Sequence, residues 1–441
     1  MSNGSTVIGK QADVVVVGSG PGGATVVREL SRAGRKVILL ERGKDYRKWA
    51  LYGTYLGATT YTDRHALLFT REGLNIIRPL MAGGATSMYC GCATRPPAWL
   101  KDKYGIDIER RVDEAIAELR IAPLPPELRG IASTRIAEAA NALGYDWEPL
   151  PKFMDPSRAR RFDCGAKCML GCRCGAKWNA AEWVDEAVAA GCEFLTEARV
   201  DDVLVENKKA VGVRGRLKGR PFEIRGRAVV LAAGGIGSPL LLQRTGLHRA
   251  GQGIAMDTTL IMYGASRFPG NGKEPPMTYA WADDEMGYML STLVDPWLMY
   301  PVITALKGFR YPLTWPRWGN TLGIMIKLKD DVSGSLESER RISKPFTPSD
   351  QRKLDHATEM ARRILIKVGA EPESIFITPM RGTHPCATVR IGHLLDRDLQ
   401  TEIENLYVCD ASAFPEALDR PTVLTIIGLG KRLSERLAYR L

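Results

Sequence analysis

The sequence has no apolar run long enough to cross a bilayer as a helix, which takes roughly 18 or more residues. Residues 1–12 also lack the basic stretch and following apolar stretch that mark a secretory signal. Low-complexity tracts and repeats of solenoid length are absent as well. We therefore expect a compactly folded protein in the cytoplasm.

Concentrated positive charge is also missing, although the net charge is +11. The basic residues are scattered and often lie near acidic ones, as in residues 327–341. Proteins that bind nucleic acid more often gather such residues on one face or segment. We expect no nucleic-acid partner, whereas an acidic protein, an anionic substrate or an anionic membrane surface stays open.

What the chain does have is length, at 441 residues, and nine cysteines. The length is too great for one simple core and predicts two lobes. In the reducing cytosol the cysteines are not expected to form a disulfide framework.

A glycine-rich turn lies near the start of the chain. A short β-branched run, residues 13–17, precedes Gly18, Gly20 and Gly23, and a helical pattern and a second strand follow, over residues 24–33 and 36–41. In a G-x-G-x-x-G turn between strand and helix, the first glycine permits the tight turn. The second lets the backbone approach a pyrophosphate, and the third lets helix and strand pack closely.

An acidic residue closes the second strand. Glu41 follows Gly23 by 18 residues, where its carboxylate can accept hydrogen bonds from ribose hydroxyls. The helix N-terminus offers free N–H groups to the phosphates. These features predict a dinucleotide site but do not separate FAD from NAD.

Further segments resemble the glucose-methanol-choline (GMC) oxidoreductase family, in that family's order. The segments are Arg78-Pro-Leu-Met-Ala-Gly-Gly-Ala-Thr-Ser, Ala228-Val-Val-Leu-Ala-Ala-Gly-Gly-Ile-Gly-Ser-Pro, His384-Pro-Cys-Ala-Thr-Val-Arg-Ile-Gly, Leu406-Tyr-Val-Cys-Asp-Ala-Ser-Ala-Phe-Pro and Pro421-Thr-Val-Leu-Thr-Ile. The resemblance implies FAD at the first turn. It also implies that the following residues contact the cofactor: Gly83, Gly84, Val200, Asp410, Ala411, Pro421 and Thr422.

The resemblance implies an α/β fold with two lobes. A discontinuous Rossmann-like FAD-binding lobe is expected from residues 11–48, 76–100, 190–250 and 384–441. Residues 251–383 are expected to form a second, substrate-binding α+β lobe, and residues 101–189 a helical and cysteine-rich insert.

His384 matches the family's active-site histidine. An imidazole can take a hydroxyl proton near neutral pH while the substrate carbon gives hydride to flavin. The sequence departs from the family at two places: Arg420 stands where a histidine or asparagine is usual, and Tyr89 where many members have asparagine. We expect Arg420 to bind a substrate oxygen, and Tyr89 is the next candidate for the base.

Four cysteines, Cys164, Cys168, Cys172 and Cys174, fall within 11 residues. Thiolates at such spacing can ligate a [4Fe-4S] cluster or zinc, and redox-active or inert thiols are the alternative. Cys90 and Cys92 could add ligands or an electron relay. We expect the [4Fe-4S] cluster, and we expect the remaining three cysteines to be small buried side chains.

The sequence thus predicts an FAD-dependent dehydrogenase that acts on a small alcohol or related CH–OH compound. Electrons would pass through the iron-sulfur cluster to an acceptor protein or a quinone. The alternatives are an electron-transfer subunit of a larger complex and a flavin enzyme that acts on carbon-carbon bonds. Residues 295–318, rich in aromatic side chains, are expected in the core or at a membrane or subunit contact.

Overall fold

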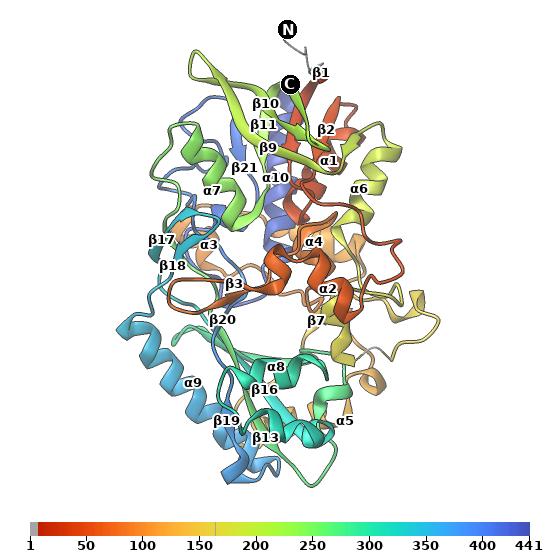
Figure 1. Ribbon diagram of the computed structural model, residues 1–441, viewed down its shortest axis with the longest axis vertical. Coiled ribbons are helices and arrows are strands. Elements are labelled where there is room, and N and C mark those ends of the chain that lie inside the picture. Colours follow the sequence, from red (N-terminus) through yellow and green to blue (C-terminus); the bar gives the residue numbers. More distant parts are fainter. Residues whose placement is uncertain (1–7, 164) are drawn as a thin grey trace.

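The computed structural model describes residues 8–163 and 165–441, and these form two lobes, each built on a β-sheet (Figure 1). The chain crosses between the lobes several times. The discontinuous assembly expected from the sequence is therefore present.

We call the first lobe the FAD-binding lobe, after the cofactor that the sequence resemblance implies. Its sheet has the strand order β8-β2-β1-β11-β10-β9, and β21 pairs with β11. Strands β8, β2, β1, β11 and β21 run parallel to one another, whereas β10 pairs antiparallel with β11, and β9 pairs antiparallel with β10. The bounds are β1 Ile8–Val17, β2 Val37–Leu40, β8 Glu193–Leu195, β9 Ala198–Glu206, β10 Lys209–Leu217, β11 Arg220–Leu231 and β21 Leu406–Val408. Strands buried on both faces explain the continuous apolar runs in β1 and β2.

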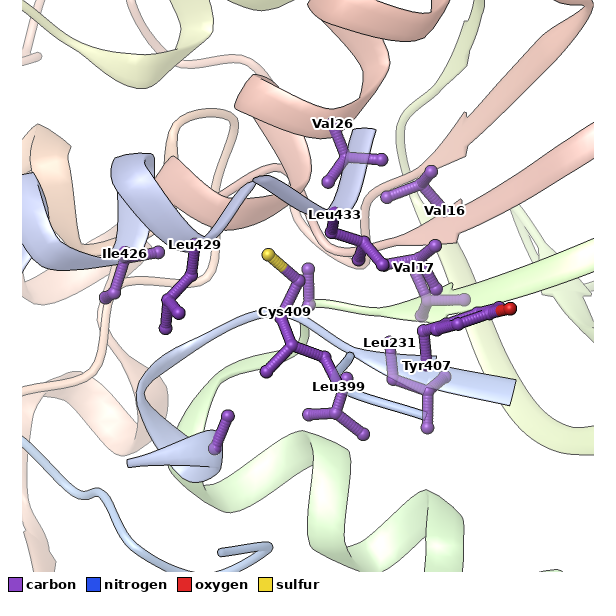
Figure 2. Close-up of a cluster of buried hydrophobic side chains, with 14 of the residues drawn as sticks. Val16, Val17, Val26, Leu231, Leu399, Tyr407, Cys409, Ile426, Leu429 and Leu433 are labelled. Carbon is purple, nitrogen blue, oxygen red and sulfur yellow. The ribbon is translucent and has the colours of Figure 1, made fainter. Parts of the chain in front are cut away.

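Helices α1 (Pro21–Arg32), α6 (Ala180–Ala189) and α10 (Val423–Arg440) cover this sheet. A proline at the first position of α1 has the backbone angle that a helix start requires. Figure 2 shows the core between α10 and the sheet, where Cys409 lies among Leu429 and Leu433. Cys192, Cys386 and Cys409 are buried, as the sequence predicted for these small side chains.

The second lobe is built on a nine-stranded sheet with the order β3-β4-β20-β13-β16-β15-β14-β6, and β19 pairs with β13. Its strands are β3 Leu68–Phe69, β4 Asn75–Ile76, β6 Glu148–Pro149, β13 Thr259–Ala265, β14 Tyr279–Asp283, β15 Tyr288–Thr292, β16 Thr321–Leu328, β19 Phe376–Ile377 and β20 Arg381–Gly382. Helices α5 (Ile131–Asn141) and α9 (Pro348–Lys367) bury one face of it.

Residues 101–189, expected as an insert, divide between the two lobes. Helix α4 (Glu109–Glu118) packs against α10, and α6 packs against α1, both in the FAD-binding lobe. Helix α5 and strand β6 complete the second lobe instead. Apolar faces on short helices are stabilised by burial against a nearby core, so most of this segment packs on the two lobes. A small apolar cluster of its own contains Leu124, Met154 and Cys168.

No helix in the described parts of the chain combines the length and the apolar character that crossing a bilayer would need.

Candidate active site

The glycine-rich turn between β1 and α1 is packed tightly on the protein side and open on the other. A Cβ on Gly18 would lie 2.3 Å from the carbonyl oxygen of Ala232, and one on Gly23 would lie 1.9 Å from that of Gly18. A Cβ on Gly20 would meet no atom within 4 Å. Gly20 therefore faces open space, as expected where a ligand approaches the backbone.

Glu41 at the end of β2 is buried against this turn. One of its carboxylate oxygens accepts hydrogen bonds from the backbone N–H of Ser19 at 3.1 Å and from the Ser19 hydroxyl at 2.6 Å. The other accepts from the backbone N–H of Gly43 at 2.8 Å. The Ser19 hydroxyl also accepts from the backbone N–H of Gly83 at 3.1 Å, which ties the predicted flavin-side loop to the turn.

A cavity of about 270 Å³ opens along this turn and extends to His384. Nine of the residues predicted to bind cofactor or substrate line it: Gly18, Gly20, Glu41, Gly84, Val200, Asp410, Ala411, Thr422 and His384. Strand ends, a glycine turn and three helix N-termini, those of α1, α7 (Gly234–Arg244) and α10, thus meet at one crevice. These features fit a dinucleotide with its pyrophosphate at the turn.

Asp410 follows β21, lines the cavity and accepts hydrogen bonds from two segments that surround it. One oxygen accepts from the backbone N–H of Gly234 at 2.8 Å and the Ser238 hydroxyl at 2.5 Å. The other accepts from the backbone N–H of Ser412 at 2.8 Å and from its hydroxyl at 2.5 Å. Burial raises the pKa of Asp410, and these four donors oppose that shift. Asp410 thereby fixes the position of Ala411 beside the cavity.

The N-terminus of α10 lies at the same end of the cavity as His384. Thr422 and Val423 line the cavity, while the Pro421 carbonyl accepts a hydrogen bond from the Thr94 hydroxyl at 3.1 Å. The positive end of a helix dipole stabilises negative charge close to it. This end of the cavity therefore favours an electron-rich ring.

His384 is held by a carboxylate that no sequence motif indicated. Its Nδ1 atom lies 2.8 Å from an oxygen of Asp257, whose other oxygen accepts from the backbone N–H of Asp419 at 3.2 Å. With Nδ1–H donating to Asp257, Nε2 carries the lone pair. Asp257 is buried and has a φ of 46°, a strained value for a residue other than glycine.

Lys327 of β16 places a buried positive charge near the histidine. Its ammonium donates to the hydroxyl of Thr383 at 2.7 Å and to that of Thr259 at 3.3 Å. Burial lowers the pKa of Lys327. Burial and the charge of Lys327 lower the pKa of His384, against the opposing effect of Asp257. The neutral imidazole that can accept a proton is thereby favoured.

Arg420, expected to bind substrate, is paired with carboxylates. Its Nε donates to Asp419 at 2.7 Å and to the carbonyl of Leu418 at 3.2 Å, and one terminal nitrogen pairs with Asp284. Burial raises the pKa of Asp419 to about 6, which the Arg420 charge opposes. Among the described residues that line the cavity Arg420 does not occur.

Tyr89 is likewise away from the cavity lining, within the described part of the chain. Its hydroxyl donates to the carbonyl of Trp178 at 2.9 Å, and its ring packs against Phe153. The Lys177 ammonium lies 5.0 Å from the ring centroid. Burial raises the pKa of Tyr89 well above its usual range, so its phenol is a poor proton acceptor here.

The cysteine-rich segment does not assemble the expected cluster site. Among residues 8–163 and 165–441 no group of three or more potential metal ligands occurs, and Cys164 lies outside the described residues. The sulfurs of Cys172 and Cys174 are 3.7 Å apart, and their hydrogen bond, with burial, raises the pKa of Cys172. Burial also raises the pKa of Cys168.

Two buried lysines lie close to the described cysteines Cys168 and Cys92. The Lys177 ammonium donates to the carbonyl of Cys168 at 2.8 Å, and the Lys152 ammonium contacts the sulfur of Cys92 at 3.1 Å. A metal cluster needs several thiolates directed at one point. The described side chains do not fit an iron-sulfur cluster or zinc.

Sequence models of the N-terminal and C-terminal domains of the GMC oxidoreductase family match residues 72–260 and 345–430, which together exceed half of the chain. An uncharacterized GMC-type oxidoreductase of Mycobacterium tuberculosis is 34% identical over 279 residues, covering 58% of this chain. The chain spans 43% of that relative's length.

A long-chain-alcohol oxidase of Arabidopsis thaliana is 24% identical over 417 residues, covering 84% of this chain and 56% of the relative. The crystal structure of pyridoxine 4-oxidase from Mesorbium loti shares the fold, with a TM-score of 0.70 at 16% identity, over 96% of this chain and 99% of that one. The chain therefore belongs to the GMC oxidoreductase family.

Proposed function

We propose that this protein oxidises the CH–OH group of a small alcohol and that His384 accepts the hydroxyl proton. The observation that supports this most is the His384–Asp257 pair at the end of the cofactor cavity. The pair leaves Nε2 as the acceptor atom, and His384 lines the same cavity as the N-terminus of α10. FAD, when bound, supplies the acceptor for the hydride that leaves the same carbon.

Each polar group around the base has a distinct part in this proposal. Asp257 holds the ring orientation and stabilises the imidazolium that forms as the proton arrives. Lys327 opposes that protonation in the resting protein and so keeps the base neutral. General base catalysis of this kind typically raises the reaction rate by about 100- to 10,000-fold.

An alcohol substrate also agrees with the Arabidopsis relative, whose name describes a long-chain-alcohol oxidase. An anionic substrate bound by Arg420 gains no support, because its guanidinium already pairs with Asp419 and Asp284. No electron-transfer step is assigned to the cysteines. A quinone or a partner protein is the proposed electron acceptor.

Anaerobic titration of the FAD-loaded protein tests the function. Primary and secondary alcohols of increasing chain length are added, and the loss of flavin absorbance is recorded. We expect at least one alcohol to bleach the wild type quickly and a His384→Ala variant slowly. If no alcohol does so and only another protein reduces the flavin, the chain is an electron-transfer subunit. Bleaching by saturated acyl compounds alone would indicate carbon-carbon chemistry.

A further inference from the structure

Large apolar side chains are exposed together in one short segment of the second lobe. Trp297, Leu298, Val302, Leu306, Phe309 and Leu313 have exposed fractions of 46%, 39%, 67%, 64%, 100% and 77%. The other exposed large apolar side chains are spread over the rest of the described chain. A contiguous patch of this kind marks an interaction surface more often than chance exposure does. We call these six residues the apolar face.

The apolar face begins on a short helix, α8 (Met299–Ala305), in the lower lobe of Figure 1. Leu298, Val302 and Leu306 follow one another at intervals of four residues, on the helix or next to its ends, and such intervals place side chains on one side of a helix. Phe309 and Leu313 lie beyond the end of α8, in a turn and in the 3-10 helix Pro312–Asn320.

The opposite side of the segment is anchored in the protein. Tyr300 and Thr304 are buried, and the Tyr300 hydroxyl bonds to that of Thr314 at 2.9 Å. The indole N–H of Trp318 donates to the carbonyl of Asp295 at 2.9 Å. The apolar face is therefore displayed by a fixed support and faces away from the core.

The charged side chains of the segment that carries the apolar face are all basic. Residues 296–320 contain no acidic residue and three basic ones, Lys307, Arg310 and Arg317. Arg317 pairs with Glu371, whereas Lys307 and Arg310 are exposed at the level of Leu306 and Phe309. Basic residues interleaved with exposed apolar ones complement the anionic surface of a phospholipid bilayer.

Tryptophans border the same face. The rings of Trp297 and Trp315 are 4.8 Å apart, and the Trp315 indole donates to the Trp297 carbonyl at 3.1 Å. Both line a cavity of about 1100 Å³ together with Trp318, Lys167 and Lys273. Tryptophan is enriched where protein meets the headgroup region, because its ring is both apolar and a hydrogen-bond donor.

We propose that the apolar face docks this protein peripherally on an anionic phospholipid surface. The face inserts Phe309, Leu313 and their neighbours into the headgroup boundary, and Lys307 and Arg310 contact the lipid phosphates. The 1100 Å³ cavity then opens next to the bilayer. This proposal does not depend on His384 or on the nature of the substrate.

Vesicle sedimentation of the FAD-loaded protein tests the docking. The vesicles are phosphatidylcholine alone, and phosphatidylcholine mixed equally with phosphatidylglycerol. We expect wild type to sediment with the anionic vesicles, and Phe309→Glu to bind roughly tenfold or more weakly, because an acidic side chain strongly disfavours the apolar boundary. Lys307→Ala should weaken binding about fivefold. The matched control is Ile131→Glu, which alters an exposed side chain on α5.

Sedimentation velocity without vesicles tests whether a second copy of this chain, and not a bilayer, covers the apolar face. If wild type forms a concentration-dependent oligomer that Phe309→Glu dissolves, the apolar face is a contact between copies of this chain and the lipid proposal is wrong. Equal binding by wild type, Phe309→Glu and Ile131→Glu, or no binding by wild type, overturns it too. Folding of each variant is checked by its bound FAD and its melting temperature.

Discussion

The Nδ1 atom of His384 lies 2.8 Å from a carboxylate oxygen of Asp257, which is 127 residues away in the sequence. The contact sets which imidazole nitrogen can take a proton. It also joins the motif that begins at His384 to the residues just before strand β13 of the second lobe. The reacting end of the cofactor cavity is therefore built from both lobes.

Replacing Asp257 with asparagine should lower the rate of flavin reduction by roughly 100-fold or more. The amide no longer stabilises the imidazolium, and it can bond to either tautomer of His384. Rapid-mixing measurements under anaerobic conditions give the rate. A fall in substrate affinity with no fall in the limiting rate would mean that Asp257 serves binding only.

Replacing Lys327 with methionine should shift the acid limb of the pH-rate profile to higher pH. His384 must be neutral to act as base, so the rate falls as pH drops through its pKa. In the wild type that pKa is lowered by burial and by Lys327, so activity should persist below the ordinary value of 6.5. Without the lysine charge the pKa rises and activity is lost at higher pH.

The Asp257→Asn variant is the matched control for this profile, because Asp257 acts on His384 in the opposite sense. Its acid limb should move to lower pH while its maximal rate falls. If the acid limbs of both pH-rate profiles moved in the same direction, the two residues would not act on the protonation of His384 in opposite senses.

Two glycines of the first turn should respond differently to alanine. Gly23→Ala places a methyl group 1.9 Å from the Gly18 carbonyl, so the FAD-free protein should melt at a lower temperature. Gly20→Ala meets no protein atom within 4 Å and has a φ of −63°, so the FAD-free protein should keep its stability. It should nevertheless bind FAD more weakly, because the methyl group points where the pyrophosphate approaches.

Calorimetry of the FAD-free proteins and fluorescence titration with FAD measure the two properties. Unchanged FAD affinity in Gly20→Ala would place the pyrophosphate elsewhere.

The sequence was informative where one local pattern determines one local structure. The turn at Gly18 to Gly23 and the strand that ends at Glu41 were predicted because a tight turn leaves few alternatives to glycine. Asp257 could not be found this way, because it reaches His384 through tertiary pairing: β13 pairs with β20, and the Met256 carbonyl accepts from the backbone N–H of His384. A signal for Lys327 was present: it is a lysine within the wholly buried strand β16.

Two other expectations gained no support from the structure, because they depend on partners that sequence spacing does not show. Arg420 stands at the motif position expected for it but is held by Asp419 and Asp284. The cysteine spacing suggested a cluster, yet the described cysteines do not gather three or more ligands at one point.

The central claim is that His384 is the proton acceptor in substrate oxidation. Anaerobic mixing of FAD-loaded His384→Ala with an alcohol that bleaches the wild type tests it most directly. We predict that flavin reduction slows about 100- to 10,000-fold while FAD stays bound. Reduction at the wild-type rate would contradict the account.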